Sequence, residues 1–330
     1  MSPSRTPMQV ETTMTRQTWV MLGALSLLWG CSFPFIKVAV GGAPPLTVVL
    51  LRVTIGALAL APVLVLAREK IPRGGAVWAA FVGMALLNNV VPWSLSVWGQ
   101  QSLTTAVAAI INATTPLFSV IVGHFFLADE RMRANRLAGV LVGFVGVAVL
   151  IGPTALTQGS DKLLPELAFI AAAISYAFSG IVGRKFARFG LTPLQAAQGQ
   201  LTASAFMMAP LALAFDHPWT LPMPTGPQVF SILGLGLLST ALAFILFFRI
   251  LARAGATNVM LVTLLVPVTA FIIGAIFLGE RLEARNFVGM AFIAAGLGLI
   301  DGRPLTYARA RLFGQPRCGM RRCRGSHRLR

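Results

Sequence analysis

Ten long apolar runs follow one another along this chain, and they restrict the folds open to it more than any other feature. An α-helix needs about 20 mostly apolar residues to cross the hydrocarbon core of a bilayer. The runs are continuous and do not alternate between apolar and polar residues, which excludes a membrane β-barrel. The sequence therefore predicts an all-α integral membrane protein with ten transmembrane helices. They are expected near residues 18–40, 45–67, 75–97, 102–126, 134–152, 165–183, 193–215, 226–248, 254–278 and 284–301.

The composition agrees with this prediction and leaves little of the chain outside the membrane. Hydrophobic residues make up 56% of the 330 residues and charged residues 11%, whereas a soluble domain carries about 25% charged residues. The connections between the apolar runs are too short to hold a soluble domain. We therefore expect the function to be performed inside the bilayer.

The distribution of positive charge predicts the orientation of the chain. The net charge is +17, and so basic a chain could in principle bind nucleic acid. If the N-terminus is cytoplasmic, however, 22 of the 27 Lys and Arg residues fall on the cytoplasmic side, as the positive-inside rule requires. The charge thus orients the protein, and no nucleic-acid partner is expected. We therefore predict a multi-pass protein of the cell membrane with two cytoplasmic tails, residues 1–17 and the basic segment 302–330.

The second half of the chain repeats the first. The segments that begin at Pro116 and Pro267 keep Pro, Gly, Leu and Asn in step, and Arg52 and Gln200 each stand seven positions after one proline and ten before another. We therefore divide the chain into residues 18–152 and 165–301. Each half has five predicted helices, an odd number, so the second half is expected to enter the membrane upside down. Inverted repeats of this kind place a binding site near the membrane midplane.

Several segments, in their order and duplication, resemble a known family. They read LLWGCSFPFIK, LLRVTIGALALAP and AAIINATTPLFSVIVGHFFLADER in the first half, and LVTLLVPVTAFIIGAIFLGER and GMAFIAAGLGLI in the second. Over about residues 18–301 the chain resembles the EamA-type members of the drug/metabolite transporter superfamily. The resemblance implies ten helices, cytoplasmic termini, a central cavity, alternating access, and transport of amino acids or other small metabolites.

Polar side chains inside the membrane are costly and mark candidate sites. Asn88 and Asn89 precede Ser239 and Thr240 by 151 positions, which suits a pocket on the axis between the two halves. Arg52, placed about 10 Å below the surface at ~1.5 Å per residue, could bind a substrate carboxylate or phosphate; alternatively it extends outward or pairs with a carbonyl. Amides and hydroxyls also join helices with no ligand present. The predicted substrate-binding residues are Asn88, Asn89, Trp93, Asn112, Tyr176, Ser239, Thr240, Trp29 and Arg52.

Prolines interrupt several of the predicted helices. Pro92, Pro116 and Pro267 each remove a backbone hydrogen bond and kink a helix. Pro116 and Pro267 correspond in the repeat. The three positions are predicted either to act as hinges or to shape the helices statically.

The positions of the acidic residues indicate which chemical class of cargo the protein carries. All ten Asp and Glu residues fall in tails, loops or helix ends, which favours zwitterionic, neutral or anionic cargo over hydrophobic cations. Glu280 is expected to pair with Arg281 in its loop.

The sequence predicts no catalytic group, metal site or cofactor, and hence no enzyme. It favours a carrier that exports small metabolites such as amino acids, with multidrug efflux or a non-transport membrane scaffold as alternatives, and a homodimer is left open.

Overall fold

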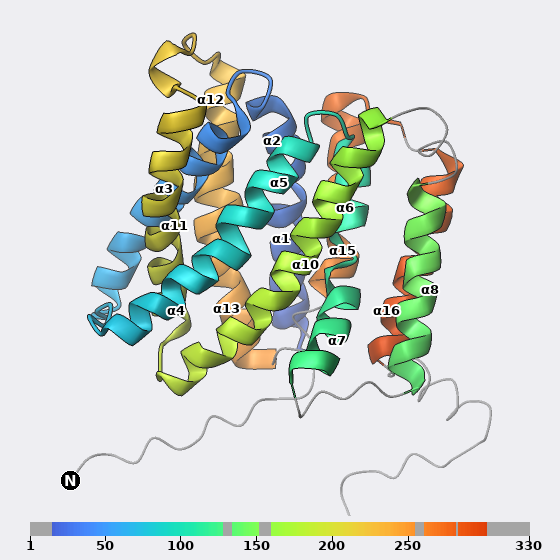
Figure 1. Cartoon of the computed structure of the whole chain (residues 1–330), viewed down its shortest axis with the longest axis horizontal. Coiled ribbons are helices and arrows are strands. Elements are labelled where there is room, and N and C mark those ends of the chain that lie inside the picture. Colours follow the sequence, from blue (N-terminus) through green and yellow to red (C-terminus); the bar gives the residue numbers. More distant parts are fainter. Residues whose placement is uncertain (1–14, 128–133, 152–159, 255–260, 282, 302–330) are drawn as a thin grey trace, which may run out of the picture.

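The computed structural model describes residues 15–127, 134–151, 160–254, 261–281 and 283–301, and all structural statements below concern these residues. Within these ranges every regular element is helical, as predicted, and none is a strand (Figure 1). Most of both expected tails and the loop with Asp129 and Glu130 lie outside them. The first half contains α1 (Arg16–Gly30), α2 (Ser32–Ala39), α3 (Pro45–Leu66), α4 (Gly75–Ala85), the π-helical η1 (Leu86–Val90), α5 (Val91–Gly99), α6 (Thr105–Asn112), α7 (Thr115–Phe126) and α8 (Ala134–Ile151).

The second half repeats this succession of helices. It contains α10 (Ser160–Arg188), α11 (Pro193–Phe215), the short 3-10 helix η2 (Pro218–Thr220), α12 (Gly226–Leu233), the π-helical η3 (Gly234–Leu242), α13 (Ala243–Ala254), α15 (Val262–Leu278) and α16 (Ala284–Asp301). Six segments are long and apolar enough to span a membrane: Arg16–Ala39, Pro45–Leu66, Gly75–Gly99, Thr105–Phe126, Leu163–Phe186 and Gly226–Leu251. Three shorter apolar helices are Ala134–Val149, Leu265–Leu278 and Ala284–Ile300. The 23 residues of α11 are long enough, but they include Gln195, Gln198 and Gln200.

The helix ends follow from local sequence. Pro45 and Pro193 occupy the first positions of α3 and α11, where a missing N–H costs nothing. Thr192 and Gln195 form a capping box at the start of α11, in which each side chain satisfies a free backbone N–H. Gly279 ends α15 with a φ of +65°, a left-handed conformation that glycine adopts without strain.

The helices pack in pairs drawn mainly from opposite halves. The principal pairs are α8 with α16, α3 with α11, α5 with α10, and α1 with α15. Figure 1 shows α8 and α16 side by side at one edge of the bundle, where Gly139 and Gly296 let the two backbones approach closely. A Cβ built on Gly139 would lie 2.6 Å from the Gly296 carbonyl oxygen. Only glycine fits at this crossing.

Acidic side chains tie α3 and α11 together at both ends. At the upper end in Figure 1, the Asp216 Oδ2 atom accepts hydrogen bonds from the Thr47 backbone N–H at 2.6 Å and the Thr47 hydroxyl at 2.9 Å. At the lower end, the Thr192 hydroxyl donates to the Glu69 carboxylate. A carboxylate at or just after the end of each helix therefore contacts the beginning of the other, where the helix dipole favours negative charge. Asp216 caps α3 through a backbone N–H, whereas Glu69 bonds the hydroxyl of Thr192, the residue that caps α11.

The upper end carries two further cross-links. The Glu280 carboxylate accepts from the Thr105 backbone N–H at 2.8 Å and the Ala106 N–H at 3.4 Å. It thus caps α6 and forms no ion pair with Arg281, although both residues are described, so the expected loop salt bridge is wrong. The physical reason is that the free amides at a helix N-terminus are strong partners for a carboxylate. Lys37 Nζ donates to the carbonyl oxygens of residues 100, 101 and 103 at 3.0–3.1 Å.

Candidate functional site

Two π-helical segments occupy corresponding positions in the two halves. Asn88 and Asn89 lie in η1, and Ser239 and Thr240, their counterparts 151 positions later, lie in η3. A π-helical segment widens the helix locally and leaves carbonyl groups in need of other donors; such segments are frequent at functional sites. Here the Ser175 hydroxyl of α10 donates to the Leu87 carbonyl at 2.8 Å. The two segments therefore concentrate polar groups at one level of the bundle.

The first polar cluster surrounds Arg52 of α3. The Arg52 Nε–H donates to the Thr240 hydroxyl at 3.0 Å, and that hydroxyl donates to the Leu235 carbonyl at 2.8 Å. The guanidinium carbon lies 3.7 Å from the centroid of the Trp93 ring, a cation–π contact. The Tyr176 hydroxyl lies beside Trp93 and within electrostatic reach of Arg52. The structure thus brings four of the predicted residues together.

The second polar cluster surrounds Gln200 of α11. The Asn88 side-chain amide donates to Gln200 Oε1 at 3.3 Å and to Asn89 Oδ1 at 3.2 Å. The Asn89 amide donates to the Ser204 hydroxyl at 2.8 Å, and Ser179 donates to Asn88 Oδ1 at 3.3 Å. Asn89, Gln200 and Ser204 are buried. The side-chain oxygens of Asn88, Asn89 and Gln200 therefore all accept hydrogen bonds from within the cluster.

The two clusters are equivalent under the repeat. Arg52 and Gln200 correspond in sequence, and each side chain bonds the π-helical segment of the opposite half, Arg52 to Thr240 and Gln200 to Asn88. Gly56 permits this approach on one side, because a Cβ there would lie 2.8 Å from the Thr240 methyl carbon. The correspondence holds for the helices and not residue by residue, because Thr240 is the counterpart of Asn89 whereas Gln200 bonds Asn88. The chemistry differs as well, since one member is a cation and the other a neutral amide.

The remaining predicted residues lie around these clusters. The Ser239 hydroxyl donates to the Leu28 carbonyl of α1 at 2.7 Å, and the Trp29 ring packs against Phe247 with centroids 5.6 Å apart. Asn112 is the last residue of α6, and its backbone carbonyl accepts from the Thr115 hydroxyl at 2.7 Å. Within the described residues, the hydrogen bonds of the two clusters do not include the Asn112 side chain.

The three prolines mark changes of helix geometry. Pro92 is the second residue of α5, directly after η1, and Pro116 is the second residue of α7, directly after the break that follows Asn112. Pro116 has no N–H for the Asn112 carbonyl, and the Thr115 hydroxyl takes that place. Pro267 lies inside α15. Whether these positions move stays a prediction.

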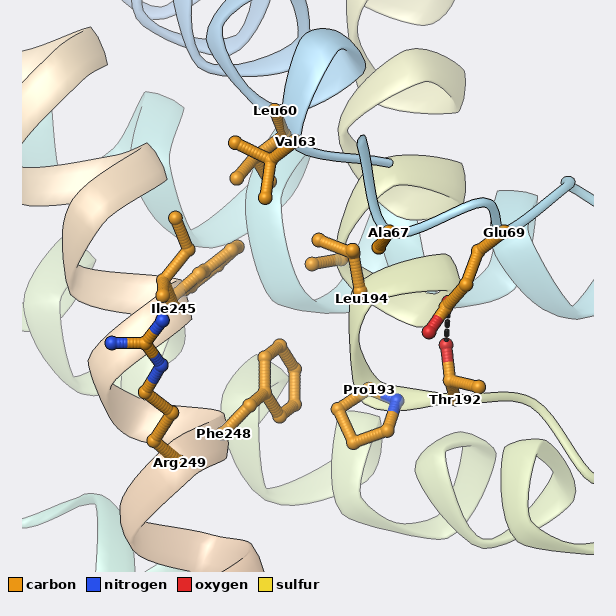
Figure 2. A pocket seen from close by; sticks show the side chains of 12 residues that line it. Leu60, Val63, Ala67, Glu69, Thr192, Pro193, Leu194, Ile245, Phe248 and Arg249 are labelled. Carbon is orange, nitrogen blue, oxygen red and sulfur yellow. Dashed lines mark hydrogen bonds between the residues drawn. The ribbon is translucent and has the colours of Figure 1, made fainter. Parts of the chain in front are cut away.

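A cavity of about 340 Å³ lies just below the clusters, between α3, α11 and α13 (Figure 2). It is bounded by Leu60, eight positions after Arg52; by Ala197, three before Gln200; and by Phe244, four after Thr240. These intervals place it one to two helical turns from the polar groups. Its wall is mostly apolar, and Glu69 and Arg249 lie on opposite sides of it (Figure 2).

Some residues of this region were not singled out by sequence reasoning. Gln200 was noticed only as the repeat partner of Arg52, and Ser204, Glu69 and Arg249 were not considered as neighbours of a site. The available signal was the repeat itself, because a candidate at Arg52 implies one at Gln200. Within the described residues, no group of three His, Cys, Asp or Glu side chains could hold a metal ion.

The apolar spans, the repeated helices and the buried polar layer define a multi-pass membrane protein of the transporter class. The EamA-like transporter family model matches residues 17–152 and again 163–300. The chain belongs to this EamA-like transporter family.

Individual relatives agree with the assignment. The uncharacterized transporter YoaV of Bacillus subtilis is 27% identical over 84% of this chain and 95% of its own length. A "Probable amino-acid metabolite efflux pump" of Escherichia coli is 26% identical over 86% and 94%. A "Probable terminal-alkyne amino-acid exporter" of Streptantibioticus cattleyicolor is 27% identical over 88% and 95%. One crystal structure, 20% identical, shares the fold with a TM-score of 0.62 over 86% of this chain and 97% of that chain.

Proposed function

We propose that this transporter exports small metabolites such as amino acids from the cytoplasm by alternating access. It would have ten spans in two inverted halves, with both termini cytoplasmic in the cell membrane. The observation that carries the proposal is the pair of equivalent polar clusters, in which each half bonds the π-helical segment of the other. Equivalent contacts across a pseudo-two-fold axis are what two halves need in order to exchange inward and outward access around a fixed site.

Contacts at the two ends of the bundle differ, and the difference indicates to which side of the membrane the cavity opens. The upper end is cross-linked by the Glu280 cap on α6 and by Lys37, in addition to the Asp216–Thr47 contact. The cavity lies on the lower side of the clusters, toward Glu69 and Arg249. The positive-inside rule assigns this lower end to the cytoplasm. A cavity open to the cytoplasm below a closed outer end is the arrangement in which an exporter collects its cargo.

The class of cargo follows from the lining and from the relatives. The cavity wall is apolar with one acidic and one basic side chain on opposite sides (Figure 2), which suits a small zwitterion with an apolar side chain. Two of the relatives are named for amino-acid export. Among the described acidic residues, Asp216 and Glu280 cap helices, and Glu69 accepts from the Thr192 hydroxyl at the start of α11. Glu166 is buried in the second turn of α10. None lies at the level of the clusters, which disfavours hydrophobic cations.

Proteoliposomes test this proposal. The purified protein is reconstituted into vesicles that are loaded with an equimolar pool of the twenty amino acids, common sugars, nucleosides, lipophilic dyes and cationic drugs. The released compounds are identified by mass spectrometry. Release of one or a few compounds faster than from protein-free vesicles is expected. Release of only lipophilic dyes and cationic drugs would establish multidrug efflux instead. No release of any compound, together with no thermal stabilisation by any of them, would favour a scaffold.

A further inference from the structure

Arg52 is a buried cation whose hydrogen-bonding capacity is only partly used. Its side chain is 7% exposed, and its Nε–H donates to Thr240. A guanidinium has five N–H donors. In the described structure its two terminal Nη groups, which carry four of these, donate to no protein atom, and neither is fully enclosed. They therefore border space between the helices.

Arg52 also has no anionic partner within the described residues. No carboxylate oxygen lies within 4.0 Å of it. Trp93 covers one face of the guanidinium and Tyr176 lies nearby, but neither carries a negative charge. A buried charge without a counter-charge costs several kcal/mol, and it attracts anions strongly because the surrounding dielectric is low.

The repeat shows that joining the halves does not require a charge at this position. Gln200, the counterpart of Arg52, bonds the opposite π-helical segment through a neutral amide at 3.3 Å. The same structural role is therefore performed without a cation on the other side of the pseudo-axis. Apart from its contact with Trp93, the positive charge of Arg52 has no partner that the packing of the halves requires, and an anionic ligand would supply its counter-charge.

We propose that the Nη groups of Arg52 bind the carboxylate of the cargo, so that the transporter selects small carboxylic acids, amino acids among them. Two parallel N–H···O bonds from a guanidinium to a carboxylate are a strong and directional pair. The Trp93 ring holds the guanidinium plane in place. Thr240 orients its Nε edge. This inference rests on the proposed function and adds the chemical group that is recognised.

The test compares each acid with its neutral analogue. Binding to the purified full-length protein is measured by thermal shift for the twenty L-amino acids, for their carboxamides and for sodium chloride. The wild type is expected to bind at least one acid about ten to a hundred times more tightly than its carboxamide, the value of one or two charged hydrogen bonds. Arg52→Gln, which copies the natural counterpart, is expected to lose this preference, and Arg52→Lys to retain part of it. Lys37→Gln is the matched control, because it removes a cation already bonded to three carbonyls, and it should keep the preference.

Four results would overturn the inference. The first is equal binding of acids and carboxamides by the wild type. This measurement needs no variant and holds even if Arg52→Gln fails to fold. The second is an unchanged acid preference in folded Arg52→Gln. Stabilisation by chloride alone that depends on Arg52 would assign the site to an inorganic anion. Release of an uncharged metabolite in the proteoliposome assay would leave the proposed function standing while this inference falls.

Discussion

The guanidinium of Arg52 stacks on the indole ring of Trp93, with 3.7 Å between the guanidinium carbon and the ring centroid. Both side chains are buried, so the contact is shielded from water, and a desolvated cation–π contact is worth about 2 kcal/mol. We expect Trp93→Leu to lower the melting temperature of the purified protein in detergent and to reduce cargo binding. Trp98→Leu is the control on the same helix, because Trp98 is 44% exposed. An equal loss of stability in both variants would contradict a specific Arg52–Trp93 contact.

The Asn89–Ser204 hydrogen bond predicts a measurable coupling between α11 and η1. Asn89 and Ser204 are fully buried and lie 2.8 Å apart. Asn89→Ala and Ser204→Ala should each destabilise the protein, and the double variant should lose less than the sum of the two. We expect a coupling of about 0.5 to 2 kcal/mol, the range of hydrogen bonds between membrane helices, from unfolding in mixed micelles. Strictly additive losses would mean that the two side chains are not bonded in the membrane.

The helical fold could be predicted because apolar runs of this length have few other solutions. The break between α6 and α7 also has a sequence cause, since Pro116 cannot donate to the Asn112 carbonyl. The π-helical geometry of η1 and η3 was not predictable, because the carbonyls it frees are satisfied by distant donors such as Ser175. Composition alone also does not give the length of each helix: six of the ten expected spans are long and apolar enough to cross a membrane, three are shorter apolar helices, and α11 carries three glutamines.

The sequence predicted which residues form the candidate site but not which of them bond to one another. The spacing placed Asn88 and Asn89 opposite Ser239 and Thr240, yet their partners depend on how far each helix is rotated about its own axis. Helices as evenly apolar as α3 and α11 do not reveal that rotation. The sequence also does not show which helix end lies beside a loop. It therefore predicted Arg281, the neighbour in sequence, as the partner of Glu280, whereas the partners are the backbone amides of α6.

Glu280→Gln should loosen the upper end of the bundle. The substitution removes the charge that faces the α6 dipole, a contribution of about 0.3–1 kcal/mol. In a cysteine-free background with Leu103→Cys, a position that is 3% exposed, the rate of maleimide labelling is expected to rise. Glu283→Gln is the control, since Glu283 is exposed and pairs with Arg285 at 2.6 Å. A labelling rate that rises equally in both variants would show that the cap on α6 plays no special part.

The α8–α16 crossing should tolerate no side chain at Gly139. An added Cβ would meet the Gly296 carbonyl at 2.6 Å, so Gly139→Ala is expected to cost about 1–3 kcal/mol through overpacking. At Gly180, where nothing lies within 4 Å of an added Cβ, alanine should be neutral or stabilising by up to about 1 kcal/mol. Thermal unfolding of the two variants gives the comparison, and similar melting temperatures would argue against a tight crossing.

The proposed orientation can be tested in intact cells. A cysteine at His217, beside the Asp216 cap, should react with a membrane-impermeant maleimide added outside, because this turn follows the upper end of α11. A cysteine at Arg188, at the end of α10, should react only after the cells are opened. The reverse pattern would invert the orientation and, with it, the side from which the cavity fills.

The reciprocal contacts at the ends of α3 and α11 predict that these two helices stay aligned during the proposed transport cycle. Sliding either helix along the other would break the Asp216–Thr47 and Glu69–Thr192 contacts together, so the pair keeps its alignment whichever side is open. Under the proposed alternating access, we therefore expect the movement to occur outside this pair, in α13, which lines the cavity. Spin labels on α3 and α11 would consequently report one distance throughout a transport cycle, whereas labels on α3 and α13 would report two.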